Sequence, residues 1–138
     1  MAGLVVLLSA TFLFQSHAAT PTSAELKLRR NWAAQHFDGT TSAFPFTFTC
    51  GGRPASELLP SWKLERERAK PQAGRAERTL TCTDPATGLR MRCEVTEYDD
   101  FPAVEWVLHF ENRGTQDTPI LEKILPLAVE LKTPAQSN

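Results

Sequence analysis

The sequence predicts a mainly β protein, a partial antiparallel β-sandwich or supersandwich preceded by one α-helix. From Phe44 onward apolar residues recur at every second position, which is the period of a half-buried strand. Turn sequences rich in Asp, Pro and Gly separate these segments, as they do in antiparallel hairpins. We therefore expect residues 1–18 to be a signal peptide, residues 19–39 the helix, and residues 40–138 a partial β-sandwich domain.

The first 18 residues have the features of an export signal. Apart from one histidine and the α-amine, nothing before Glu25 is ionisable. The apolar segments Leu4–Leu8 and Phe12–Phe14 are too short to span a bilayer, which takes about 20 residues, but they suit a signal-peptide core. The small residues Ser16 and Ala18 predict cleavage after Ala18. We expect export to the periplasm or the medium. Because no Lys or Arg precedes the apolar run, a hydrophobic start of another origin or a misplaced gene start stays open.

The helix is predicted from its cap and its period. Thr22 and Glu25 have the spacing of a capping box, Pro21 precedes them, and Gly39 is a suitable stop. The expected apolar stripe consists of Leu28, Trp32 and His36, thickened by Leu26, Ala33 and Phe37. We expect this helix to pack on the sheet that follows.

The first strands flank a turn-rich connection. Residues 44–50 alternate Phe and Cys with Pro and Thr, and Gly51 and Gly52 end that strand. Residues 53–61 form the connection, Trp62 begins the next strand, and residues 70–76 form a polar loop.

Two hairpins follow. Asp84–Gly88 has the chemistry of a turn, because Asp accepts hydrogen bonds, Pro presets φ and Gly takes a positive φ. That loop sets Asp84 against Leu89, Cys82 against Met91 and Leu80 against Cys93, all on one face. For the second hairpin we expect a two-residue turn at Asp99-Asp100, which sets Tyr98 against Phe101, Val95 against Val104 and Cys93 against Trp106.

The final element is predicted as a strand pair over residues 120–131, interrupted by Pro126. The result is one sheet of five to seven strands with an apolar face, which the helix and a second sheet must cover.

The three cysteines are predicted to be small buried apolar side chains. Cys82 and Cys93 are diagonal neighbours in the expected register, about 7–8 Å apart, which is beyond comfortable disulfide reach. A bridge from Cys50 to either stays open.

Composition gives no reason to expect a nucleic-acid partner. The charges of the 15 basic and 16 acidic side chains nearly cancel. The sequence has no Lys- and Arg-rich run that would form a basic patch for nucleic acid. The cysteines also lack the close pairing of a zinc site, and we expect no metal and no cofactor.

We expect no complete catalytic site. No nucleophile elbow, zinc-protease helix, P-loop or dinucleotide motif occurs in the sequence. His36 is expected to pack in the helix stripe, and His109 to make a cross-strand hydrogen bond. The carboxylates considered as glycosidase pairs are Asp99 with Asp100, Glu105 with Glu111, and Glu94 with Glu105, and each is better explained as a solvated face. Trp106 is assigned to packing. Trp62 is the one weak candidate for a sugar contact.

Several long strings resemble the N-terminal domain of bacterial α-galactosidases of glycoside hydrolase family 36. They are Phe44–Lys63, Thr83–Leu89, Arg92–Val95, Tyr98–Trp106, Phe110–Asn112 and Asp117–Glu122. The resemblance covers Phe44 to about Leu127 and implies a β-supersandwich ahead of a (β/α)₈ catalytic barrel. It implies retaining hydrolysis through two barrel aspartates, which no residue here matches. A barrel takes about 200 residues or more, so this chain does not contain one.

Two hypotheses follow, the first from the resemblance and the second from the complete hairpin chemistry and Trp62. In the first, the chain is the N-terminal portion of an exported α-galactosidase-like enzyme. It is inactive alone, its partners are the missing barrel and, through the parent, carbohydrate, and a homo-oligomer is compatible with it. In the second, it is a free-standing β-sandwich that binds carbohydrate or protein without catalysis.

Overall fold

The computed structural model describes residues 20–70 and 72–130, so the expected signal peptide lies outside the described residues. The chain forms two antiparallel sheets and one long N-terminal helix, which confirms the predicted mainly β class and partial sandwich. Its elements are α1 (Ser23–Phe37), η1 (Thr41–Ala43), β1 (Thr47–Cys50), β2 (Arg53–Pro54), α2 (Ala55–Leu58), η2 (Leu59–Ser61), β3 (Lys63–Arg68), β4 (Arg75–Thr83), β5 (Leu89–Tyr98), β6 (Val104–Asn112) and β7 (Leu121–Leu125).

Helix α1 begins with the predicted capping box. The Thr22 hydroxyl accepts from the Glu25 backbone N–H at 3.2 Å, and the Glu25 carboxylate accepts from the Thr22 N–H at 2.7 Å. The buried face differs from the expected stripe: Arg29, Ala33 and Phe37 are buried, whereas Leu28 is exposed. Successive residues point about 100° apart around a helix, so placing Arg29 inward turns Leu28 out.

The larger sheet has the strand order β3-β4-β5-β6. The first hairpin has the predicted register, with Cys82 opposite Met91 and Leu80 opposite Cys93. Strand β4 begins at Arg75, inside the predicted polar loop, because that segment pairs with the far end of β5, where Arg75 lies opposite Tyr98.

The second hairpin corrects the prediction. Val95 lies opposite Trp106, not Val104, and Glu97 lies opposite Val104. In the observed register Pro102 lies in the connection, outside the paired strands. The connection therefore runs from Tyr98, whose N–H donates to the Ala103 carbonyl. A shift of two residues keeps every side chain on its predicted face.

The smaller sheet has the order β2-β1-β7, so the structure contains two sheets rather than one sheet of five to seven strands. Strand β7 ends at Leu125, and no second strand follows in residues 126–130. The predicted strand pair is thus one strand, because Pro126 ends it. Strand β7 carries a β-bulge, with one extra residue opposite the segment from Thr47 to Thr49 of β1. Lys123, in this part of β7, has a positive φ of 49°.

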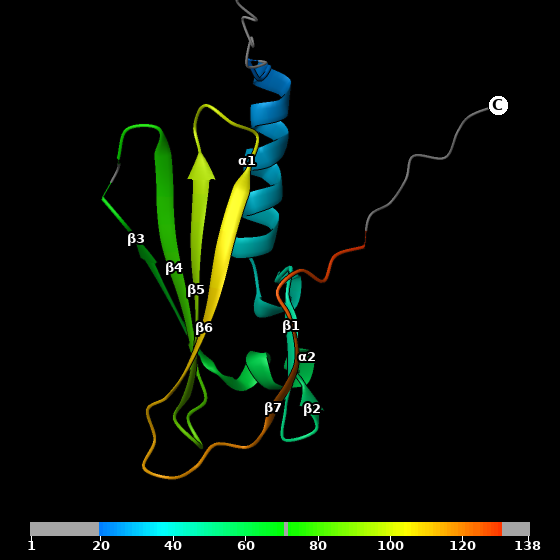
Figure 1. Ribbon diagram of the computed structural model, residues 1–138, viewed down its shortest axis with the longest axis vertical. Helices are drawn as coiled ribbons and strands as arrows, with labels where there is room; N and C mark the ends of the chain where they lie inside the picture. The colour runs from blue at the N-terminus through cyan, green and yellow to red at the C-terminus, as the bar shows by residue number, and fades with distance from the viewer. Residues whose placement is uncertain (1–19, 71, 131–138) are drawn as a thin grey trace, which may run out of the picture.

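The core lies between the four-stranded sheet and a layer made of α1 and the smaller sheet. Figure 1 shows α1 beside the upper part of the large sheet, with β1, β2 and β7 below the helix. Phe37 from α1 lies 5.7 Å from Trp106 of β6, and Phe48 of β1 lies 5.1 Å from Phe110 of the same strand, measured between ring centroids. One continuous apolar core therefore joins helix α1, the smaller sheet and the four-stranded sheet.

Two loops meet at one end of this core. Gly88 has a φ of 77°, and a Cβ there would lie 2.7 Å from the backbone nitrogen of Gly114. The Arg113 N–H donates to the Gly88 carbonyl at 3.0 Å. The close approach of the β4–β5 turn to the β6–β7 loop therefore requires glycine at Gly88.

Candidate functional site

Trp62, the candidate sugar contact, is in the interior. Its side chain belongs to the core cluster, the residue is 6% exposed, and its ring lies 6.0 Å from Phe48. The Trp62 N–H closes η2 by donating to the Leu59 carbonyl, and the chain enters β3 with this ring directed inward. A buried ring cannot stack on a sugar, so the assignment of Trp62 as a sugar contact is corrected to a core residue.

Three of the five carboxylates considered as acid/base groups have another partner. Glu94 lies 3.1 Å from Arg92 and 3.3 Å from His109, which is the expected cross-strand hydrogen bond of that histidine. Glu105 accepts from the Tyr98 hydroxyl at 2.8 Å. Glu111 lies 3.1 Å from Arg113, while Asp99 and Asp100 are exposed in their loop. Glu94 and Glu111 thus form exposed ion pairs, Glu105 is hydrogen-bonded to a tyrosine, and Asp99 and Asp100 face solvent.

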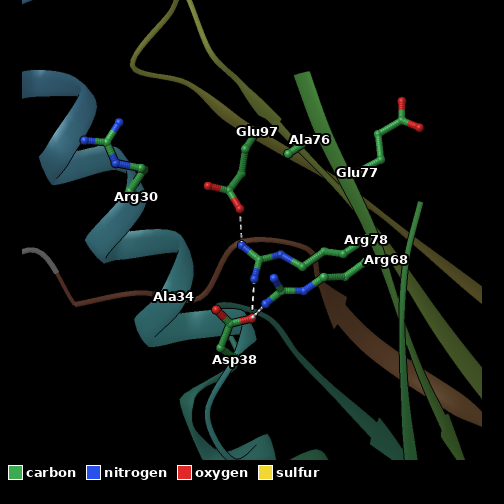
Figure 2. A pocket seen from close by; sticks show the side chains of 8 residues that line it. All are labelled: Arg30, Ala34, Asp38, Arg68, Ala76, Glu77, Arg78 and Glu97. Atoms are coloured by element: carbon green, nitrogen blue, oxygen red, sulfur yellow. Dashed lines mark hydrogen bonds and ion pairs between the residues drawn. The ribbon is translucent and has the colours of Figure 1, made fainter. Parts of the chain in front are cut away.

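A hollow of about 210 Å³ lies where the helix meets the large sheet (Figure 2). It is lined by Arg30, Ala34 and Asp38 from the helix side and by Arg68, Ala76, Glu77, Arg78 and Glu97 from the sheet. Figure 2 shows the guanidinium of Arg78 between the carboxylates of Glu97 and Asp38, with Arg30 and Glu77 pointing away.

The charges at this junction alternate in sign. Arg29 lies 2.6 Å from Glu97, Glu97 and Asp38 both accept from Arg78, and Arg68 lies 3.7 Å from Asp38. The outer side chains are the more exposed, 78% for Arg68 and 41% for Asp38, whereas those of Arg78, Glu97 and Arg29 are 11%, 14% and 5% exposed. Charge-assisted hydrogen bonds compensate each buried charge, which would otherwise cost several kcal/mol, on the order of 3–5, to leave unpaired.

These ion pairs hold helix α1 against the large sheet, and they leave no free acid or base for a reaction. Both oxygens of Glu97 accept from arginines, one from Arg29 and one from Arg78. Guanidinium groups stay protonated in proteins, so they supply no base. The Arg78 guanidinium carbon also lies 5.7 Å from the centre of the Phe37 ring, which ties the charges to the apolar core. The junction is thus a structural ion network between α1, β4 and β5.

The sequence analysis did not predict this ion network, although the positions of Arg29 and Glu97 in the sequence point to it. Arg29 stands four residues before Ala33 and eight before Phe37, so it continues the buried face of the helix. Glu97 follows Val95 by two residues on β5 and therefore points to the same face of the sheet. Charged residues at inward positions of two facing elements indicate a buried ion pair.

The three cysteine side chains are buried, as predicted, and all are free, so the bridge from Cys50 that the sequence left open does not form. Burial raises the pKa of Cys82 to about 11 and that of Cys93 to about 12. A thiol with such a pKa contributes almost no thiolate at neutral pH, so neither is a nucleophile.

The described residues contain no group of His, Cys, Asp and Glu side chains arranged to hold a metal ion. In the same part of the chain no helix has the length and apolar character needed to cross a membrane.

Comparisons with family models, curated proteins and solved structures gave no match to this chain.

Proposed function

We propose that this chain is the N-terminal, non-catalytic portion of an exported α-galactosidase-like glycoside hydrolase. The parent enzyme acts on terminal α-galactosides, and the chain is inactive on its own. Its principal partner is then the catalytic barrel of the same polypeptide, which supplies the two aspartates of a retaining mechanism.

The observation that carries this proposal is the ordered resemblance between Phe44 and about Leu127. Its strings span β1 to the start of β3, the β4–β5 turn and the β5–β6 hairpin. The resembling residues therefore cover connected parts of one β domain, and its two sheets are compatible with part of the β-supersandwich that the resemblance implies.

The surface of β7 also supports a larger parent. The exposed apolar side chains in and next to this strand are Ile120, Ile124, Leu125 and Leu127. Strand β7 lies at the edge of the smaller sheet, and an exposed edge strand with apolar side chains offers a place where other protein can pack.

Hydrolysis assays test the proposal. The chain and the protein encoded by the whole reading frame of its gene are incubated with 4-nitrophenyl α-galactoside and with raffinose. We expect hydrolysis by the whole-frame protein and none by the chain alone. Hydrolysis by the chain alone, or a whole-frame protein that folds but cleaves neither substrate, contradicts it.

A second function, binding without catalysis by a free-standing sandwich, is favoured by the closed core. The helix and both sheets share one apolar cluster, which gives the chain the means to fold alone. Stable, cooperative unfolding of a gene product that ends at Asn138 would favour this alternative over the first.

A further inference from the structure

Strand β6 forms one open edge of the four-stranded sheet. Figure 1 shows it on the side of the sheet opposite β3, and within the part of the chain that the structure describes it pairs only with β5. Two hydrogen bonds show which of its backbone groups face β5. The Tyr98 N–H donates to the Ala103 carbonyl before the strand, and the Arg113 N–H donates to the Gly88 carbonyl after it. Odd-numbered residues of β6 therefore bond to β5, and the N–H and C=O groups of its even-numbered residues point to the open edge.

This edge lacks the features by which proteins usually prevent the addition of a strand. Edge strands are commonly protected by shortness, charge, proline or a bulge. Strand β2 has two residues and ends in Pro54, every residue of β3 except Leu64 is charged, and β7 carries the bulge near Lys123. Strand β6 has nine residues, an unbroken register with β5, and no lysine, arginine or proline. It is therefore the edge best suited to pair with a further strand.

The inward side chains of β6 are only partly buried. On the neighbouring strand β5 the inward side chains are 2% exposed or less, and they are those of Leu89, Met91, Cys93 and Val95. On β6 the inward side chains pack against the same core but stay partly exposed, and they are those of Val104, Trp106, Leu108 and Phe110. The difference arises because no strand lies beyond β6. A strand added there would bury more of this apolar surface.

The outward face of β6 is polar except at its centre. Glu105, His109 and Glu111 alternate with Val107, which is 46% exposed. Glu105 stands two residues before this valine and His109 two residues after it. When two such strands run antiparallel about the valine, each carboxylate therefore meets an imidazole of the other strand, which can donate a hydrogen bond to it.

We propose that the chain forms a symmetric dimer in which the β6 strands of two copies pair antiparallel, with Val107 on the two-fold axis. Val107 then lies opposite Val107 of the second copy, and Glu105 lies opposite His109 of the second copy. The Tyr98 hydroxyl occupies Oε2 of Glu105 and Glu94 occupies Nε2 of His109, so Oε1 and Nδ1 remain for the contact between copies.

The inward residues match in the same register. Trp106 lies opposite Leu108 of the second copy, and Val104 lies opposite Phe110 of the second copy. Even-numbered residues thus face even-numbered residues, and their outward N–H and C=O groups form about eight hydrogen bonds. The two four-stranded sheets become one continuous sheet.

The charges select this register over its neighbours. With the axis moved to Leu108, Glu105 would lie opposite Glu111 of the second copy, and like charges directly opposite each other destabilise a strand pair. With the axis moved to Trp106, Glu105 would lie opposite Val107 and lose its imidazole partner. The dimer rests on the described strand alone and does not depend on the proposed function, which the hydrolysis assays test separately.

Sedimentation equilibrium of the purified full chain tests the dimer. We expect dimers at up to about 200 μM, a concentration that detects a micromolar Kd. Val107→Lys places two like charges on the axis and should raise the Kd of the dimer about tenfold. The matched control is Ile124→Lys, which changes a side chain of similar exposure, 41%, on the edge strand β7 and should leave the Kd unchanged. Circular dichroism verifies that both variants fold.

Cross-linking through introduced cysteines tests the register. Opposite residues of a pair that is not hydrogen-bonded have Cα atoms about 4.5 Å apart, within disulfide range, so Val107→Cys should give a disulfide-linked dimer on mild oxidation. In Glu105→Cys the two new thiols belong to residues about 13 Å apart, and no link should form. The native cysteines are buried and do not compete.

Three outcomes overturn the proposal. The first is a chain that stays monomeric at every concentration, since the edge of β6 would then be open to a different polypeptide. The second is a Val107→Lys variant that associates as tightly as the unaltered chain, which would place the contact elsewhere, as in the apolar N-terminal segment. The third is a link in Glu105→Cys without one in Val107→Cys, which would show a different register.

Discussion

Arg29 of helix α1 lies 2.6 Å from Glu97 of strand β5, and their side chains are 5% and 14% exposed. The helix is therefore attached to the sheet by a charged contact set within its apolar face. Arg78 extends that contact to Asp38 at the end of the helix.

Replacing Glu97 should destabilise the fold strongly. Glu97→Gln leaves Arg29 and Arg78 without the carboxylate that both bind, and breaking a buried pair in this way costs about 3 kcal/mol. Urea unfolding followed by circular dichroism measures the loss. The control is Glu111→Gln, an exposed pair with Arg113, which should cost less than about 1 kcal/mol. Equal losses for the two variants would contradict a buried network.

Removing both partners should cost less than removing one. The double variant Arg29→Met with Glu97→Leu leaves no uncompensated charge at that contact, and Asp38 still holds Arg78. We expect its free energy of unfolding to exceed that of Glu97→Gln, because apolar replacement of a buried pair is often close to neutral. A double variant less stable than Glu97→Gln would show that packing, not charge, dominates there.

The N-terminal cap of helix α1 should contribute measurably to the free energy of unfolding. Thr22→Ala removes the acceptor for the Glu25 N–H and should cost about 1 kcal/mol. Thr40→Ala is the control, because Thr40 precedes η1 without making a cap hydrogen bond.

The same cap predicts a dependence on pH. Its hydrogen bonds with the Thr22 N–H and hydroxyl lower the pKa of Glu25 below the usual 4.5. The stabilisation is therefore present above pH 4.5 and is lost as the pH falls through the lower folded-state value. The stability difference between the unaltered chain and Thr22→Ala should shrink in acid, and a constant difference would argue against the capping box.

Trp62 should matter for stability. Trp62→Ala removes a buried ring from contact with Phe48 and should cost about 3–5 kcal/mol. Trp62→Phe should recover much of that loss. A loss of less than about 0.5 kcal/mol for Trp62→Ala, as substitutions at the surface give, would contradict the burial of this ring.

The thiols should be inert until the chain unfolds. With pKa values raised by burial to about 11 and 12, Cys82 and Cys93 should react slowly with a disulfide reagent at about pH 8 and rapidly in denaturant. Since the folded-state pKa values lie above the ordinary 9.0, their contribution to stability is complete below pH 9 and is lost as the pH rises through 11 to 12. Fast reaction of the folded chain would contradict their burial.

The sequence predicted correctly those parts of the fold that depend on residues close together in the chain. The turn from Asp84 to Gly88 sets its own register, and the Thr22–Glu25 box sets the start of α1, and both are confirmed. The predicted register of the second hairpin is wrong by two residues, because the turn tendency of Asp99-Asp100 does not by itself determine where the two strands begin to pair.

Tertiary contacts determine what the sequence could not reveal. The inward direction of Trp62 depends on how η2 meets β3, which no short-range pattern encodes. The sequence placed Trp32 in the apolar stripe of the helix, but it could not predict that the Trp32 ring lies 5.7 Å from that of Trp106 on β6.

The central claim, that this chain is the N-terminal part of a larger glycosidase, is tested most directly by the DNA that follows the codon of Asn138 in the source genome. The account predicts that coding sequence continues, directly or after a frameshift, into further strands and a barrel with two catalytic aspartates. A genuine stop codon followed by unrelated sequence would contradict the enzyme proposal and leave a small binding sandwich in its place.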